Sequence, residues 1–76
     1  MHITPQSTNV TLATFNNGVQ VLFSYKTPVA CYIPNRGYFR SAQQFSVTTS
    51  RHINTWMGKG GNILPQNDIE NIVGAL

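Results

Sequence analysis

Residues 45–54 read Phe-Ser-Val-Thr-Thr-Ser-Arg-His-Ile-Asn, and this run marks the point where strand patterns give way to a helix. A hydroxyl of Thr48 or Thr49 can accept a hydrogen bond from a free backbone N–H at a helix start. The apolar residues that follow recur at i, i+3 and i+4 and so share one face: Ile53, Trp56 and Met57. We therefore expect a helix that Thr48 or Thr49 caps and that Gly58 ends.

Before this run, apolar and polar residues alternate as they do in strands. Two strands are expected, over 9–15 and 19–25. Asn17-Gly18 suits a two-residue type I′ turn between them, because both positions of that turn need a positive φ. This turn would place Leu12 opposite Phe23, with the more apolar residues of both strands on one face.

Two shorter strands are expected over 29–33 and 38–41, because Pro34-Asn35-Arg36-Gly37 between them is a strong turn signal. A polar arm is expected over 1–8 and a flexible loop over 59–62. A second helix follows Pro65, and its apolar positions share one face: Ile69, Ile72, Val73 and Leu76.

The sequence thus predicts one small α+β domain over residues 1–76. Its meander of three or four antiparallel strands lies within 9–41, and two C-terminal helices within 48–76 pack on one face of it. A chain of 76 residues has a marginal core, so dimerisation is a further possible source of stability.

Charge is sparse and uneven along the chain. The five cations are Lys26, Arg36, Arg40, Arg51 and Lys59, and both acids, Asp68 and Glu70, come after all of them. A positive field of this kind favours anionic partners, either nucleic acid or an acidic protein surface. The alternative is that the cations only keep a small protein soluble.

Cellular location is constrained by what the sequence lacks. The single cysteine, Cys31, permits no intramolecular disulfide, and no basic segment followed by an apolar stretch opens the chain. Its apolar runs are far shorter than a membrane span. We expect a cytoplasmic protein with no membrane contact.

Two segments carry a family resemblance: Ser-Tyr-Lys-Thr-Pro-Val-Ala at 24–30 and the run at 45–54. Together they resemble a family of short uncharacterised proteins found mainly in bacteriophage genomes and prophages. That family shares a Ser-Tyr-x-Thr-x-Val-Ala element and, further along, an aromatic-Ser-x-Thr-Thr-Ser-basic-His-Ile-Asn element. The resemblance implies a viral origin and a β-meander followed by helices, and it implies no activity. With the cytoplasmic location expected above, a viral origin places the protein in the host cytoplasm.

Residue spacing argues against an enzyme. Ser50 and His52 are two apart, so on a helix they point in nearly opposite directions and cannot form a catalytic pair. Asp68 and Glu70 have the same spacing, and Cys31 lies in a strand where a buried thiol is the usual case. The chain has neither a metal-ligand spacing nor a glycine-rich phosphate loop, so no metal and no cofactor are expected.

Two anion-binding surfaces are predicted. At the helix start, free N–H groups with Thr49, Ser50 and Arg51 can bind a phosphate; the alternative is that these residues only cap the helix. On a strand, one face carries two guanidinium groups beside an aromatic ring, which suits a sugar-phosphate backbone with a stacked base: Arg36, Tyr38 and Arg40. The alternative is an ordinary solvated face, or arginines that protect an edge strand.

Three residues of the 45–57 region are assigned structural roles. His52 is expected to donate from its ring to a backbone carbonyl, Asn54 to bond a loop carbonyl, and Trp56 to anchor the core. The chain is accordingly interpreted as a non-enzymatic binding protein, first of all for nucleic acid. Two alternatives are an inhibitor of a host or defence protein and a minor structural or self-assembling protein.

Overall fold

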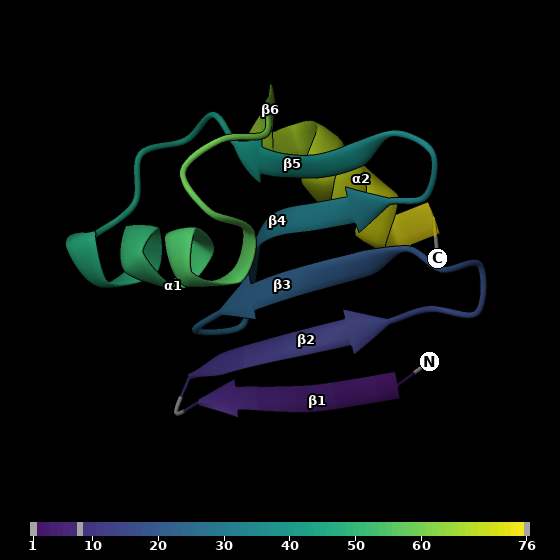
Figure 1. Ribbon diagram of the computed structural model, residues 1–76, viewed down its shortest axis with the longest axis horizontal. Coiled ribbons are helices and arrows are strands. Elements are labelled where there is room, and N and C mark those ends of the chain that lie inside the picture. Colours follow the sequence, from purple (N-terminus) through teal and green to yellow (C-terminus); the bar gives the residue numbers. More distant parts are fainter. Residues whose placement is uncertain (1, 8, 76) are drawn as a thin grey trace.

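Six strands form one mixed sheet, in which the order in space follows the order along the chain (Figure 1). The computed structural model describes residues 2–7 and 9–75. The strands are β1 (His2–Ser7), β2 (Val10–Thr14), β3 (Gln20–Ser24), β4 (Thr27–Ile33), β5 (Gly37–Ser41) and β6 (Asn62–Leu64). The helices are α1 (Val47–Met57) and α2 (Gln66–Ala75). Neighbouring strands from β1 to β5 are antiparallel, whereas β6 runs parallel to β5.

The α+β class is confirmed, but the predicted arrangement of the helices is wrong. They are not two consecutive C-terminal helices, because β6 lies between them. A parallel pair such as β5 and β6 needs a crossover connection, and α1 supplies it. The short β6 could not be recognised from the sequence because only three residues form it, and they follow a glycine-rich stretch.

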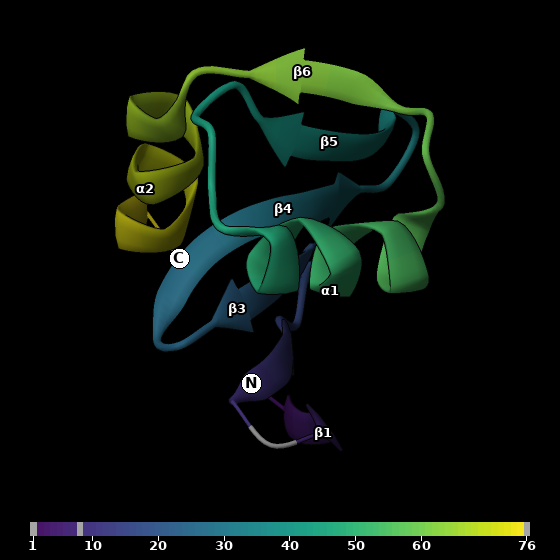
Figure 2. The same cartoon turned by 90° about the vertical axis from the view of Figure 1, so that its left-hand side faces the viewer.

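The two helices also cover opposite faces of the sheet instead of one (Figure 2). Ile53 of α1 belongs to a buried cluster with Val10, Leu22, Val29 and Ala30. On the other side, α2 packs Ile72 and Val73 against a second cluster: Val19, Val21 and Cys31. We call these two sides of the sheet the α1 face and the α2 face.

The polar segment expected to be a loose arm is an edge strand. Residues 2–7 pair with β2, with Ile3 opposite Ala13 and Thr4 opposite Leu12. Pro5 has no N–H to donate, which an edge strand tolerates because its outer side has no neighbour. The sequence pattern missed β1 because the strand lacks apolar alternation. Of the arm predicted over 1–8, Met1 and Thr8 lie outside the described residues.

The hairpin between β2 and β3 forms, but its predicted register is wrong by one residue. Leu12 lies opposite Leu22 instead of Phe23. The loop has three residues, because Phe15 N donates to the Val19 carbonyl at 2.9 Å and Gly18 N to the Phe15 carbonyl at 2.9 Å. Gly18 has a φ of 89°, as expected for the left-handed position of a three-residue loop.

This register follows from burial on both faces of the sheet. Val21 and Leu22 are adjacent in β3 and point to opposite faces, yet each is 0% exposed. An apolar–polar alternation, which assumes one wet face, therefore does not describe this strand. With this register Ser24 lies on the α1 face, on the same side as Leu22, and there it meets the helix.

The start of α1 also differs from the prediction. Its N-cap is Ser46, whose side chain accepts a hydrogen bond from Thr49 N at 3.3 Å. Thr48 and Thr49 both lie inside the helix. Gly58 ends the helix as expected, and its N–H donates to the Asn54 carbonyl. The start of α2 follows Pro65, whose carbonyl accepts from Asp68 N and Ile69 N; the predicted apolar position Leu76 lies outside the described residues.

Across residues 2–7 and 9–75, no helix is both long and apolar enough to cross a membrane.

The turn into β6 generates a stability prediction. Gly61 has a φ of 97°, and a Cβ there would overlap Met57 Cε and lie 3.4 Å from the Tyr38 carbonyl oxygen. Gly61→Ala should therefore lower the free energy of unfolding by at least about 1–2 kcal/mol, measured by urea titration. Gly60→Ala is the matched control, because a Cβ there meets nothing within 4 Å. Equal effects of the two substitutions would contradict this packing.

Candidate functional site

A chain of polar side chains joins α1 to the sheet. Ser24, at the end of β3, is 2% exposed. Its Oγ lies 3.1 Å from Thr49 Oγ1 and 2.9 Å from His52 Nδ1. Thr49 and His52 are three residues apart in α1, so they share the helix face that lies over the sheet. Ser46 Oγ continues the chain by donating to Thr49 Oγ1 at 3.4 Å.

This Ser24 network brings together the two segments that carry the sequence resemblance, 24–30 and 45–54. It also corrects the role expected of His52, whose Nδ1 pairs with a side-chain hydroxyl and not with a backbone carbonyl. The sequence could not reveal the pair because 28 residues separate its members. The signal that could have indicated it is a serine directly after three consecutive apolar strand residues, 21–23.

The network has the chemistry of a structural link. A catalytic serine must be open to substrate, whereas Ser24 is buried under α1. In serine hydrolases a carboxylate orients the histidine, but here both acids lie on α2, on the opposite face of the sheet. The hydroxyls and the imidazole satisfy one another, which is what buried polar groups require.

The three residues of the predicted strand surface have different surroundings in the structure. Arg36 is exposed in the turn between β4 and β5, and Tyr38 is 41% exposed on the α1 face. Arg40, in contrast, donates from Nη2 to Asn54 Oδ1 at 3.0 Å and to the Gly58 carbonyl. A cation at that position complements the negative end of the α1 dipole. Arg40 is thus a partner of the Asn54 side-chain oxygen, which the sequence did not predict.

Tyr38 is the centre of an aromatic row that the sequence did not predict. Its ring centroid lies 4.9 Å from that of Tyr32 and 5.3 Å from that of Trp56, which it meets edge to face. Trp56, expected to anchor the core, is only partly buried and packs against the α1-face cluster. The residue of α1 that is buried within this cluster is Ile53. Cross-strand pairing of Tyr32 with Tyr38 and the turn of α1 above them create this row.

The predicted phosphate site at the helix start is also divided. Thr49 is buried, and its hydroxyl is engaged with Ser24 and Ser46. Ser50 and Arg51 instead lie on the outer side of α1, where they line a shallow hollow of about 340 Å³. Val47, Asn54 and Thr55 complete this hollow, and Thr48 is exposed at the helix start. The two hydroxyls and the guanidinium of the predicted site therefore do not converge on one point.

Charge is distributed unequally between the two faces. Arg40 and Arg51 lie on the α1 side, whereas Asp68 and Glu70 lie on α2. Glu70 accepts a hydrogen bond from Gln66 Nε2 at 3.0 Å, and among residues 2–7 and 9–75 no acid pairs with an arginine. The α1 side thus keeps its positive charge.

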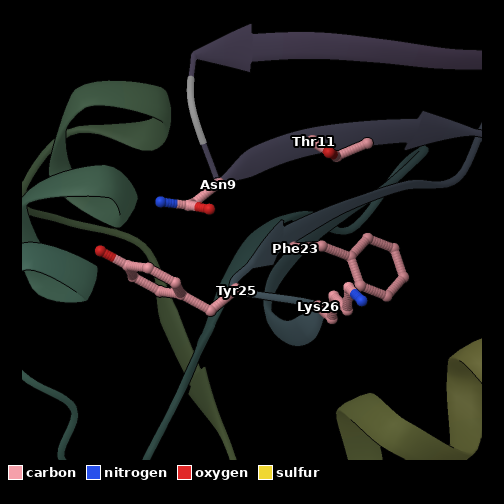
Figure 3. A pocket seen from close by; sticks show the side chains of 5 residues that line it. All are labelled: Asn9, Thr11, Phe23, Tyr25 and Lys26. Carbon is pink, nitrogen blue, oxygen red and sulfur yellow. The ribbon is translucent and has the colours of Figure 1, made fainter.

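A larger hollow, of about 590 Å³, lies beside the turn between β3 and β4 (Figure 3). Its lining comes from both strands of the first hairpin and from two turns: Asn9, Thr11, Phe23, Tyr25 and Lys26. The Tyr25 ring lies 6.0 Å from the His52 ring. Periodicity could not indicate this groove, because its shape depends on the register of β2 and β3.

The thiol of Cys31 and the metal-ligating side chains were the remaining candidates for reactive chemistry. Cys31 is buried in β4, and burial raises the pKa of its thiol to about 11. Little reactive thiolate is therefore present near neutral pH. The described residues include no group of three metal-ligating side chains.

The Ser24 network predicts a loss of stability when its central hydroxyl is removed. Ser24→Ala leaves Thr49 Oγ1 and His52 Nδ1 without their shared partner, so the free energy of unfolding should fall by about 1–3 kcal/mol. Ser50→Ala, on the outer side of α1, serves as the control and should change it by less than about 0.5 kcal/mol. Chemical denaturation of both variants measures the difference. An unchanged stability of Ser24→Ala would contradict the link.

The buried thiol predicts a pH dependence. Above pH 9 the unfolded chain releases the Cys31 proton while the folded chain, with a pKa of about 11, retains it. The buried neutral thiol therefore contributes fully to the stability of the folded state below pH 9, and this contribution is lost as the pH rises toward 11. Between pH 8 and 10.5 the free energy of unfolding should fall by about 2 kcal/mol more in the unsubstituted protein than in Cys31→Ala. The free energy of unfolding of both proteins is measured by urea titration at each pH. An equal fall with pH in the two proteins would refute this prediction.

Residues 1–71 match a family described as a family of unknown function (DUF8033). No curated protein and no solved structure matches the chain. The matched range contains both resemblance segments, all six strands and α1. Because the match covers most of the sequence, the chain belongs to this family of unknown function, DUF8033.

Proposed function

We propose that this protein acts by binding and that its α1 side contacts nucleic acid. The observation that carries the proposal is the separation of charge across the sheet. Arg40 and Arg51 lie on the α1 side, and the acids Asp68 and Glu70 lie on the helix of the opposite face. An unneutralised positive side attracts a phosphate backbone over several ångströms and makes the binding dependent on salt.

The aromatic row supplies the second element of the proposal. Tyr38 is 41% exposed, and contacts with Tyr32 and Trp56 hold its ring in place. A base that stacks on an exposed and supported ring gains affinity without requiring a particular base identity. Bases of a duplex are already stacked on one another, so the row favours single strands or unpaired ends.

The arginines contribute in different ways. Arg36 and Arg51 are exposed and are proposed to contact phosphates directly. Arg40 is a positioning residue, because its guanidinium bonds Asn54 and the Gly58 carbonyl at the end of α1. It thereby fixes the helix so that Trp56 lies against Tyr38 of the sheet. It still contributes positive charge to the field.

The proposal extends to the setting in which the protein works. The segments 24–30 and 45–54 support an origin in a bacteriophage or prophage, and hence action in the host cytoplasm on nucleic acid. An acidic host or defence protein would be attracted by the same charge, and the experiment below separates this case from nucleic acid.

The test is titration of a fluorescein-labelled single-stranded oligonucleotide at two salt concentrations. Arg36→Ala combined with Arg51→Ala should lower the slope of log K against log salt by about 1.4, because two phosphate contacts are lost. Tyr38→Ala should weaken binding by about 5- to 150-fold, the equivalent of one stacked base. Tyr38→Phe keeps the ring and should keep most of the affinity.

Lys26→Gly is the matched control for charge, because it also removes a cation but lies outside the α1 face, and glycine suits the positive φ of 73° there. It should leave the oligonucleotide affinity nearly unchanged. Absence of binding at low salt, or equal losses in Lys26→Gly and Arg51→Ala, would exclude the proposed surface. A binding partner that survives nuclease treatment of a host lysate would favour the acidic-protein alternative.

A further inference from the structure

The aromatic row at Tyr38 continues along α1 as far as the β3–β4 turn. Trp56, which meets Tyr38 edge to face, lies four residues after His52, so their Cβ atoms are neighbours about 5–6 Å apart on the helix. The His52 ring in turn lies 6.0 Å from the Tyr25 ring, at an angle of 34°. The result is one line of rings, which we call the aromatic stripe: Tyr32, Tyr38, Trp56, His52 and Tyr25.

Two rings of the stripe are well exposed, and two partly buried rings lie between them. Tyr25 is 52% exposed and Tyr38 is 41% exposed, whereas His52 and Trp56 are partly buried. The His52 ring is held in place because its Nδ1 bonds the buried Ser24 Oγ at 2.9 Å. Each exposed ring therefore lies against a ring that α1 and the sheet fix.

The Tyr25 side chain lies on the α1 side of the β3–β4 turn. Figure 3 shows its ring and the Asn9 carboxamide turned toward α1, whereas the Phe23 ring and the Lys26 side chain lie on the other side of the end of β3. The Tyr25 N–H donates to the Asn9 carbonyl at 2.9 Å, which fixes the turn against the residue before β2. Tyr25 therefore shares the α1 side of the molecule with Tyr38.

Neither the turn nor the core requires a tyrosine at position 25. Ser24 pairs with Thr27, so Tyr25 and Lys26 form a two-residue loop, and their φ values are 52° and 73°. Loops of this kind strongly prefer Asn-Gly, because other side chains are strained at a positive φ. More than half of the Tyr25 side chain is exposed, so its ring adds little to the core. A strained residue with an exposed ring is typical of a position that contacts a ligand.

Positive charge accompanies the stripe. Arg51 directly precedes His52, and Arg36 lies two residues before Tyr38; both arginines are exposed. The acidic side chains lie on α2, which covers the other face of the sheet. An anionic strand on the stripe therefore has cations beside it and no carboxylate side chain.

We propose that Tyr25 is a second stacking platform for the single strand that binds Tyr38, and that the strand runs along the aromatic stripe. This inference rests on the nucleic-acid function proposed above and extends it from one base to a path. Three steps of about 5–6 Å join the Tyr25 and Tyr38 rings, which corresponds to at most about five nucleotides at about 3.4 Å each in a stacked strand. Unpaired bases stack on both rings, so the ligand is single-stranded nucleic acid with little base preference.

The test is titration of the full chain with a fluorescein-labelled oligothymidylate of eight nucleotides at low salt. Tyr25→Asn removes the ring, and asparagine tolerates a positive φ, so the affinity should fall by about 5- to 150-fold with no fall in Tm. Tyr25→Phe keeps the ring and should keep most of the affinity. Lys26→Gly is the matched control, because it changes the same turn and removes a cation but leaves the ring, and it should bind nearly as well as the unsubstituted chain.

Stoichiometry shows whether one strand contacts both rings. Calorimetric titration with the oligothymidylate in excess should saturate at one strand per chain. Tyr25→Asn combined with Tyr38→Ala should lower the affinity by about the product of the two separate losses. Saturation at two strands per chain would show two independent sites and would overturn the shared path.

The remaining outcomes separate this inference from the function on which it rests. An unchanged affinity of Tyr25→Asn beside a weakened Tyr38→Ala would overturn the path and leave nucleic-acid binding by the α1 side in place. No binding by the unsubstituted chain would exclude both. An equal loss in Tyr25→Asn and Lys26→Gly would assign the effect to the turn instead of the ring, and a fall in the Tm of Tyr25→Asn would overturn the argument from strain.

Discussion

The parallel pairing of β5 and β6 is the constraint on which the arrangement of this molecule depends. Two parallel neighbours cannot be joined by a tight turn, so the chain must cross one face of the sheet between them. That crossing is α1, and it buries Ile53 against Leu22 and Val29. After β6 the chain continues into α2, which covers the other face through Ile72 and Val73. The central strands β3 and β4 thus have both faces buried within a chain of 76 residues.

Placement of α1 over the sheet also determines the chemistry of that side. Once Ile53 is buried, the helix positions three or four residues from it, together with the adjacent His52, reach the sheet or its rim. Thr49 and His52 meet the Ser24 hydroxyl, and Trp56 meets Tyr38. A buried serine without partners would cost about 1–3 kcal/mol, so these bonds favour one position of the helix over others. Arg40 reinforces that position from β5 through Asn54 and Gly58.

The same geometry places the acids, the arginines and the strained turn of the molecule in three different regions. Its acids lie on α2, Arg51 lies on the outer side of α1, and the strained turn at Tyr25 and Lys26 lies beside the uncovered part of the first hairpin. Thr49 and Arg51 do not converge on a single anion site in this arrangement. It provides instead two surfaces with different chemistry: a positive side with a supported tyrosine ring, and a groove with aromatic and amide groups beside one ammonium.

Local sequence determined the elements that depend on neighbouring residues alone. The strands β2 to β5, the end of α1 at Gly58, the helix after Pro65 and the burial of Cys31 all follow from short-range patterns and turn residues. Tertiary structure decided the remainder: β1 and β6 exist because neighbouring strands complete their hydrogen bonds, and the hairpin register depends on burial of both Val21 and Leu22. The Ser24–His52 pair, the aromatic row at Tyr38 and the groove at Tyr25 join residues far apart in the chain. Their geometry depends on packing, which periodicity does not encode.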